Sequence, residues 1–507
     1  MLYCYDWSQV LILRLPMKKI SFLPVFLLFL VSYVAAQTTQ KPSQQLPPPT
    51  AQADQQEKEP EHKVTPEEAK ELFQSVDEVL KFASTSTLFP MKHPVKKAMV
   101  SREQVERYID SKFKDDVDRI RFERSELVLK KFGLLPRTFD LHTFLIKLLG
   151  EQVAGYYDEK TKTINLLDWV HLDMQKPVMA HELTHALQDQ SFDLGKMIKK
   201  DEEIERRGPE DPNALIKVDE ESSCRTAVLE GQAMIVLVDY ILAPAGRSVE
   251  NSPQFVDMMQ ASMDKRGESP LFDNAPLLLR EELVFPYSHG MKFIQQLLAA
   301  GGKKLAYTGV LERMPLTTRE ILEPQEYLAG HRVPPLLLPE MGFLKKEYEP
   351  FDAGAVGEFD VNILLKQYTD EDIAKRLAPE WRGGAYYAAG RKGVKPGTPN
   401  STAHIGLIYV SRWSSDKVAK EFAKIYASAL PGRYSRLEHL EATAANSGRE
   451  KYSSADGPIF IDQQGDLVVV TESFDDPTAD LLIQAARKQV QNDSKSAAQA
   501  VSENHKL

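Results

Sequence analysis

The sequence contains very little cysteine, with two residues, Cys4 and Cys224, in a chain of 507. So few cysteines exclude a scaffold held together by a network of disulfide bonds. The fold must instead be stabilised by a hydrophobic core, which a chain of this length can build. We interpret Cys224 as a packing residue rather than as a nucleophile.

An excess of basic residues is also missing. The 63 lysines and arginines are outnumbered by 73 aspartates and glutamates, which gives a formal net charge of −10 at pH 7. A surface with this balance repels a phosphate backbone, so we do not expect nucleic acid as a partner.

Apolar runs long enough to span a membrane are not expected after the N-terminal region. Residues 17–19 are Met-Lys-Lys, residues 20–34 are nearly all apolar, and small residues follow up to Ala36. This order is typical of a secretory signal, so we expect residues 1–36 to be a signal peptide and the protein to be secreted or periplasmic. The residues before Met17 fit such a signal poorly, which favours Met17 as the true start. The alternative is an uncleaved anchor, which would be the membrane contact, although the run is short for a spanning helix.

One short segment, His-Glu-Leu-Thr-His at residues 181–185, has a spacing suited to metal chemistry. On a helix, histidines four residues apart lie ~40° apart on one face, so both imidazoles can bind one Zn²⁺. Glu182 follows the first histidine, and its carboxylate can reach a metal-bound water without becoming a ligand. Apolar neighbours favour a buried helix, with Pro177 in its first turn and Asp173 as a candidate cap. A solvated helix that carries two histidines by chance is the alternative.

A catalytic zinc site needs a third protein ligand, which should come from a second helix. Residues 219–240 begin with carboxylates, which suit a helix N-terminus, and then become apolar almost all round. Glu230 is the lone carboxylate within that apolar run, and its burial is costly unless it binds a cation or a partner. We therefore predict that His181, His185 and Glu230 bind one Zn²⁺. A salt bridge from Glu230 to a cation such as Arg225 is the alternative.

The two helices together resemble the gluzincin branch of zinc metallopeptidases, in which His-Glu-x-x-His precedes a helix with a Glu-Gly pair, here Glu230-Gly231. The longer string Ala-His-Glu-Leu-Thr-His-Ala-Leu-Gln-Asp-Gln at 180–190 resembles a group of secreted bacterial proteins of that branch. The segments 285–290 and 315–322 share this resemblance.

The resemblance covers roughly residues 64–335 and, more loosely, the remainder. It implies a zinc cofactor and Glu182 as the general base. Several gluzincins carry an aspartate four residues after the ligand glutamate, where it orients a ligand histidine. This chain has Met234 at that position, so the orienting group must come from elsewhere.

A predicted hairpin precedes the first of these helices, with strand-like segments at 155–158 and 163–167 around a polar turn. In zincin folds such a strand forms the upper rim of the cleft and pairs with extended substrate. We expect it to be an exposed edge within reach of His181, and an ordinary core hairpin is the alternative.

Tyr287 and His289 are candidates for the group that stabilises the oxyanion during peptide hydrolysis. They belong to a Phe-Pro-Tyr-Ser-His-Gly segment that we expect to interrupt a mainly helical region. The alternative is a helix-start motif with a buried tyrosine.

The predicted fold class is α+β, with a mainly helical zincin-like metallopeptidase core, an edge hairpin and a smaller C-terminal α+β domain. Thr65 to Glu68 form a capping-box helix start, so the fold should begin near Val64. The expected divisions are a signal peptide at 1–36, a disordered Pro/Gln-rich spacer at 37–63, a metallopeptidase domain with an N-terminal helical subdomain at 64–335, the C-terminal domain at 340–490 and a disordered tail at 491–507.

These patterns together predict a secreted zinc metallopeptidase that hydrolyses peptide bonds through a metal-bound water with Glu182 as general base. Its partner would be a peptide or protein substrate. One alternative is a catalytically inactive binding protein on the zincin scaffold. The other is a zinc amide hydrolase that acts on cell-wall material.

Overall fold

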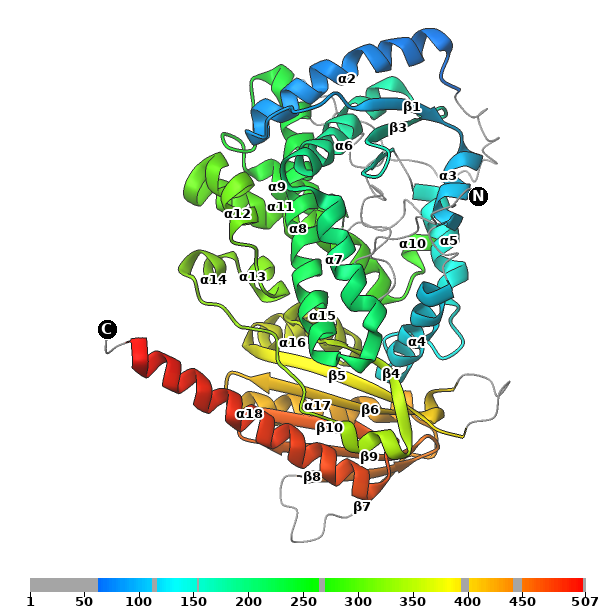
Figure 1. The fold of residues 1–507 in the computed structure, drawn as a ribbon, viewed down its shortest axis with the longest axis vertical. Coiled ribbons are helices and arrows are strands. Elements are labelled where there is room, and N and C mark those ends of the chain that lie inside the picture. The colour runs from blue at the N-terminus through cyan, green and yellow to red at the C-terminus, as the bar shows by residue number, and fades with distance from the viewer. Residues whose placement is uncertain are drawn as a thin grey trace, which may run out of the picture.

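The computed structural model describes residues 63–111, 116–152, 155–263, 270–393, 401–440 and 449–504. A mainly helical part comes first, and a β-sheet with its own helices follows (Figure 1). This arrangement confirms the α+β class with a smaller C-terminal domain. The expected signal peptide and nearly all of the spacer lie outside the described residues.

The N-terminal helices form one side of the helical part. The first, α2 (Pro66–Thr87), begins with the capping box expected from the sequence, because Glu68 N donates to Thr65 Oγ1 over 3.3 Å and Thr65 N donates to Glu68 Oε2 over 2.7 Å. The buried face of α2 includes Leu72, Val76 and Val79. The next helices are α3 (Arg102–Ser111), α4 (Asp116–Phe132) and α5 (Leu141–Gln152).

A three-stranded sheet in the order β1-β3-β2 lies against these helices and leads into α6 (Leu172–Phe192). Strand β2 (Tyr156–Asp158) is antiparallel to β3 (Thr163–Leu167), and β3 is parallel to β1 (Lys96–Val100). The expected hairpin is therefore present. Among the described strands β2 is an edge, whereas β3 is central, so the expectation of an edge is wrong for β3. Tyr156 and Tyr157 of β2 are buried, so this edge is not exposed as expected.

Three long helices form the centre of the helical part: α6, α8 (Pro212–Leu242) and α11 (Leu277–Lys303). Helices α8 and α11 approach closely where two glycines meet. A Cβ atom on Gly231 would lie 2.3 Å from the carbonyl carbon of Gly290, and one on Gly290 would lie 2.1 Å from the carbonyl oxygen of Ala227. The absence of side chains at both positions allows this contact.

Helix α8 with its final turn, Pro212–Ala245, is long and apolar enough to cross a membrane, contrary to our expectation for this region. Its most apolar window is 83% buried inside the described structure. Helices α6 and α11 pack against α8 and bury it. Its apolar composition is therefore that of a central core helix.

Three boundaries differ from those expected. Helix α6 starts at Leu172, so Pro177 lies in its second turn and Asp173 is not the cap. The side chain of Gln175 fixes this earlier start, because it donates to the carbonyls of Leu167 and Val170 just before the helix. Helix α8 starts at Pro212 rather than near residue 219. Helix α11 continues through residues 285–290 without interruption, with Pro286 inside it.

The remaining helices of this part surround the centre. They are α7 (Leu194–Arg207), α9 (Gln254–Met263), α10 (Pro270–Asp273), the π-helical turn η4 (Lys304–Gly309), α12 (Val310–Glu312), α13 (Thr318–Leu322) and α14 (Pro324–Ala329).

The C-terminal domain contains an antiparallel seven-stranded sheet in the order β4-β5-β6-β10-β9-β8-β7. Its strands are β4 (Tyr348–Ala355), β5 (Trp381–Arg391), β6 (Ile405–Trp413), β7 (Glu438–Leu440), β8 (Arg449–Ser454), β9 (Gly457–Gln464) and β10 (Leu467–Glu472). Its helices are α15 (Glu358–Tyr368), α16 (Glu371–Leu377), α17 (Asp416–Arg433) and α18 (Asp476–Asn504). Helix α18 continues into the stretch 491–507, which we expected to be disordered.

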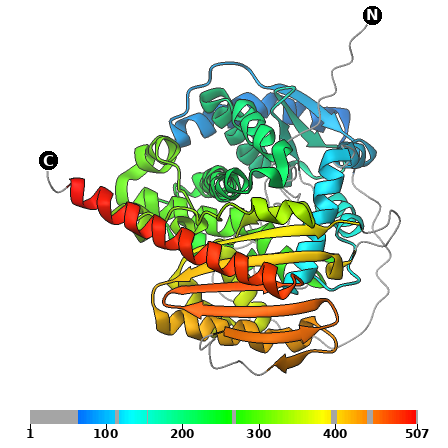
Figure 2. The ribbon, with the colours of Figure 1, turned by 60° about the horizontal axis from the view of Figure 1, so that its bottom comes forward.

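Helices cover both faces of this sheet (Figure 2). Successive residues of β10 point to opposite faces, so Val468 and Val470 pack in the cluster that contains α17, and Val469 packs in the cluster that contains α18. The strand is therefore apolar on both sides, as its Leu-Val-Val-Val sequence predicts.

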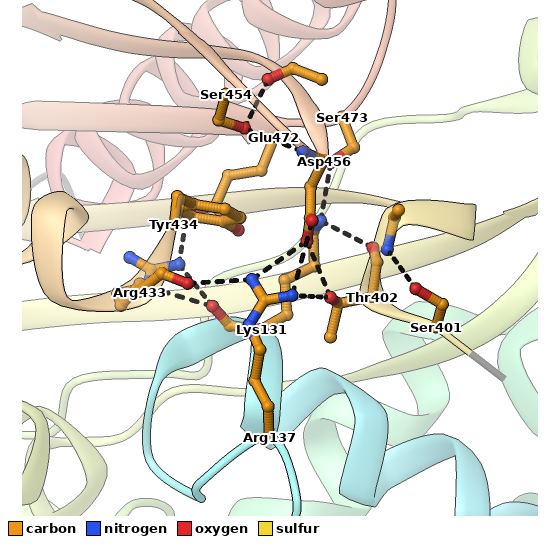
Figure 3. Close-up of polar contacts among 12 residues, drawn as sticks. Lys131, Arg137, Ser401, Thr402, Arg433, Tyr434, Ser454, Asp456, Glu472 and Ser473 are labelled. Carbon is orange, nitrogen blue, oxygen red and sulfur yellow. Dashed lines mark hydrogen bonds and ion pairs between the residues drawn. The ribbon is translucent and has the colours of Figure 1, made fainter. Parts of the chain in front are cut away.

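A buried polar cluster joins the end of α4 to the C-terminal domain (Figure 3). Lys131 Nζ donates to the carbonyl of Thr402 over 3.0 Å and to Ser473 Oγ over 2.7 Å. Arg433 donates from Nε to the carbonyl of Lys131 over 3.1 Å and from Nη2 to Glu472 Oε1 over 2.6 Å. These contacts fix the sheet domain to the helical part.

Candidate metal centre

Helix α6 carries the first part of the site. Its residues 177–189 are all buried, and His181, Glu182 and His185 are at most 1% exposed. Because the histidines are four residues apart, both imidazoles project from one face, and their Nε2 atoms lie 3.0 Å apart.

Helix α8 brings the third group to these histidines. Glu230 is 1% exposed, and its Oε2 atom lies 3.1 Å from His181 Nε2 and 3.3 Å from His185 Nε2. The three residues form a buried group whose ligand atoms all lie within 4.8 Å of one another. The spatial convergence of His181, His185 and Glu230 therefore agrees with the expectation from the sequence.

The chemistry of the three groups favours a positive charge between them. Burial alone would lower the pKa of His185, but the Glu230 carboxylate raises it to about 9. Burial would raise the pKa of Glu230, but His185 and His181 hold it below its usual value. For His181, burial dominates and lowers the pKa. The cluster thus attracts a cation, whether a proton or a metal ion.

The spacing fits a metal ion. Tetrahedral zinc with ligand bonds of ~2.0–2.1 Å places neighbouring ligand atoms about 3.3 Å apart. The three separations in this site are 3.0, 3.1 and 3.3 Å. Two imidazole nitrogens and one carboxylate oxygen are also a donor set that such an ion accepts, so the residues could hold a metal ion.

Glu182 lies beside the three ligand candidates but is not one of them. Its Oε2 atom accepts a hydrogen bond of 2.7 Å from the backbone N–H of Tyr157 on β2. Burial, with a smaller contribution from Glu230, raises the pKa of Glu182 to about 8. The contact places the outer edge of β2 next to this carboxylate.

A glutamine that the sequence patterns did not single out orients His185. Gln188 Oε1 lies 2.8 Å from His185 Nδ1, and Gln188 Nε2 donates to Leu229 O and Gln232 Oε1. These contacts hold the Nδ1 side of the His185 ring, on the side away from His181 and Glu230. The available sequence signal was weak: Gln188 and Gln232 lie close to the proposed ligands, at three residues after His185 and two residues after Glu230.

The structure separates the two oxyanion candidates. The ring of Tyr287 stacks beside His181 with 6.3 Å between ring centroids, and burial raises the pKa of its hydroxyl well above the usual value. His289 instead lies beside Phe285, with 5.5 Å between ring centroids. Residues two apart on a helix point about 160° apart, so Tyr287 and His289 cannot both face the metal centre.

The alternative partner considered for Glu230 is engaged elsewhere. Arg225 forms an ion pair with Asp201 of α7.

No protein-family model matches the sequence, and neither a curated protein nor a solved structure does. Inferences about function therefore rest on the residues and geometry of this site.

Proposed function

We propose that the protein is a zinc-dependent metallopeptidase of gluzincin type that hydrolyses peptide bonds. The observation that carries the proposal is the convergence of His181, His185 and Glu230 with Glu182 immediately beside them. A purely structural cluster would not need Glu182, a second buried acid whose Oε1 atom lacks a hydrogen-bond partner among the described residues.

His181, His185 and Glu230 would hold the metal, which when bound would supply Lewis acidity and lower the pKa of a water to ~7. Glu182 would accept a proton from the attacking water and deliver it to the leaving amine. The Tyr287 hydroxyl, kept protonated by its burial, would donate a hydrogen bond to the oxyanion.

Strand β2 would hold the substrate backbone. It is an edge of its sheet, and the N–H of Tyr157 points to Glu182 rather than to β3. A peptide added along this edge would lie next to the proposed base and would pair with the Tyr157 carbonyl, because the Tyr157 N–H already donates to Glu182. Main-chain pairing of this kind predicts broad side-chain selectivity.

The Glu182→Gln variant tests the proposal. It removes the base but leaves both histidines, so zinc content and fold should be retained while peptide cleavage falls by about 10²–10⁴-fold. Equal cleavage by both proteins would exclude Glu182 as the base. Zinc binding without cleavage of a diverse peptide library by the wild type would favour the binding-protein alternative.

A secreted or periplasmic location belongs to the same proposal and is supported by the signal-like pattern of residues 1–36. Expression of the full sequence in a bacterial host, followed by fractionation and N-terminal sequencing, tests it. Mature protein that begins near residue 37 outside the cytoplasm is the expected result, and retention of the full chain in the cytoplasm would contradict it.

A further inference from the structure

Two buried glutamines connect a proposed metal ligand to a distant backbone turn. His185 Nδ1 lies 2.8 Å from Gln188 Oε1, and Gln188 Nε2 lies 2.9 Å from Gln232 Oε1. Gln232 Nε2 then donates to the carbonyls of Ala306 and Tyr307 in η4, over 2.8 and 3.0 Å. Gln188 and Gln232 are both fully buried.

The carbonyl groups of η4 determine the direction of every hydrogen bond in this series of contacts. Backbone carbonyls can only accept, so the NH₂ group of Gln232 must face Ala306 and Tyr307. Its oxygen therefore faces Gln188, whose NH₂ group must donate to it and to Leu229 O over 3.0 Å. The oxygen of Gln188 is then left facing His185, and Nδ1 of that ring must be the protonated nitrogen.

We propose that Gln188 and Gln232 are positioning residues that fix His185 in the tautomer whose Nε2 lone pair points at the metal. The inference rests on the metal centre of the proposed function. It assigns the orienting role to a neutral amide relay rather than to a carboxylate. The relay also connects α6 and α8 with η4. A shift of that π-helical turn would therefore change the orientation of His185 through the side chains of Gln232 and Gln188.

The contacts on the opposite side of the His185 ring do not supply this constraint. Its Nε2 atom faces His181 and Glu230, which belong to the metal site itself. Met234, at the position where several gluzincins carry an aspartate, has no charged group, and its thioether sulfur is only a weak acceptor.

Zinc affinity of four variants tests the relay, measured by competition with a chelator at fixed pH. Gln188→Leu should weaken zinc binding by about 10- to 100-fold, as expected when a ligand histidine loses its orienting partner. Gln232→Leu should weaken zinc binding less. The double variant should bind zinc no more weakly than Gln188→Leu alone, because both changes interrupt the same series of hydrogen bonds.

Gln175→Leu, the fourth variant, is the matched control. Gln175 is a fully buried glutamine of the same helix, and it makes hydrogen bonds to Leu167 and Val170 instead of to a ligand. The variant should lose stability but keep its zinc affinity. An equal loss of affinity in this control would overturn the specific role of Gln188.

A spectroscopic measurement on the zinc-loaded wild type requires no variant. In ¹⁵N-edited NMR spectra, the Nδ1–H of His185 should appear as a slowly exchanging, downfield imidazole signal that disappears in Gln188→Leu. A signal from Nε2–H instead would overturn the relay. So would wild-type affinity in Gln188→Leu, or strictly additive losses in the double variant. A wild type that binds no zinc would overturn the metal site as well, which separates that failure from a failure of the relay alone.

Discussion

The close contact between α8 and α11 makes Gly231 a sensitive position. Replacement by alanine would place a Cβ atom 2.3 Å from both the carbonyl carbon and the oxygen of Gly290, and 2.9 Å from Met291 N. All three are backbone atoms, so no side-chain rotation can relieve the contact. Because ordinary carbon contacts lie at about 3.5–4.0 Å, the helices must separate by about 1 Å.

Two opposing effects set the magnitude. Alanine is favoured over glycine by about 1 kcal/mol within a helix. Overpacking of a well-packed core costs about 1–3 kcal/mol, and a clash with backbone belongs at the upper end of that range. The Gly231→Ala protein should therefore be less stable by about 1–2 kcal/mol. The same displacement moves the adjacent Glu230, so zinc affinity should also fall.

Urea denaturation and zinc titration of the purified variant measure both effects. Gly195→Ala is the control, because a Cβ atom there would lie 3.9 Å from its nearest neighbour, Asp193 Oδ1, inside another helix. This control should match the wild type or exceed its stability by up to about 1 kcal/mol. A Gly231→Ala protein as stable as the control, with unchanged zinc affinity, would refute the reasoning.

Three further outcomes follow from the structure. Burial lowers the pKa of Lys131 to about 8 from 10.5, so the folded state loses this proton before the unfolded state does. The free energy of unfolding should therefore rise between about pH 8 and 10.5, and Lys131→Met should flatten that rise; an identical pH profile would contradict this. A zinc concentration 100-fold above the dissociation constant should stabilise the protein by about 2.7 kcal/mol in thermal unfolding, and chelation should reverse the effect. Glu220→Ala, which leaves the buried Thr318 N–H without its 2.6 Å acceptor, should cost about 1–3 kcal/mol, whereas the exposed neighbour Glu221→Ala should cost little.

The part of the site that the sequence predicts well depends on local spacing. His181 and His185 converge because four residues make about one helical turn, whatever surrounds the helix. Glu230 could be found because a single carboxylate in an apolar helix requires a compensating charge. Both arguments need information from one segment at a time.

The features that were missed depend on contacts between segments. Gln188 lies 44 residues before Gln232, and nothing in either helix alone shows that the two amides meet. Proline was misleading twice, since helix α6 starts before Pro177 and α11 continues through its internal proline. In both places tertiary packing outweighs the local preference of proline for a helix start. The central position of β3 likewise depends on pairing with β1, which lies over 60 residues earlier.

Three consecutive residues show why α8 is the element on which the site depends. Glu230 faces the histidines of α6, Gly231 contacts α11, and Gln232 reaches both Gln188 and η4. Successive residues of a helix point ~100° apart, so three neighbours in sequence can contact three different parts of the protein. A displacement of α8 that improves one contact must disturb the others. The Glu-Gly pair therefore combines a ligand with the close packing that holds it, and the following glutamine extends this constraint to the orientation of His185.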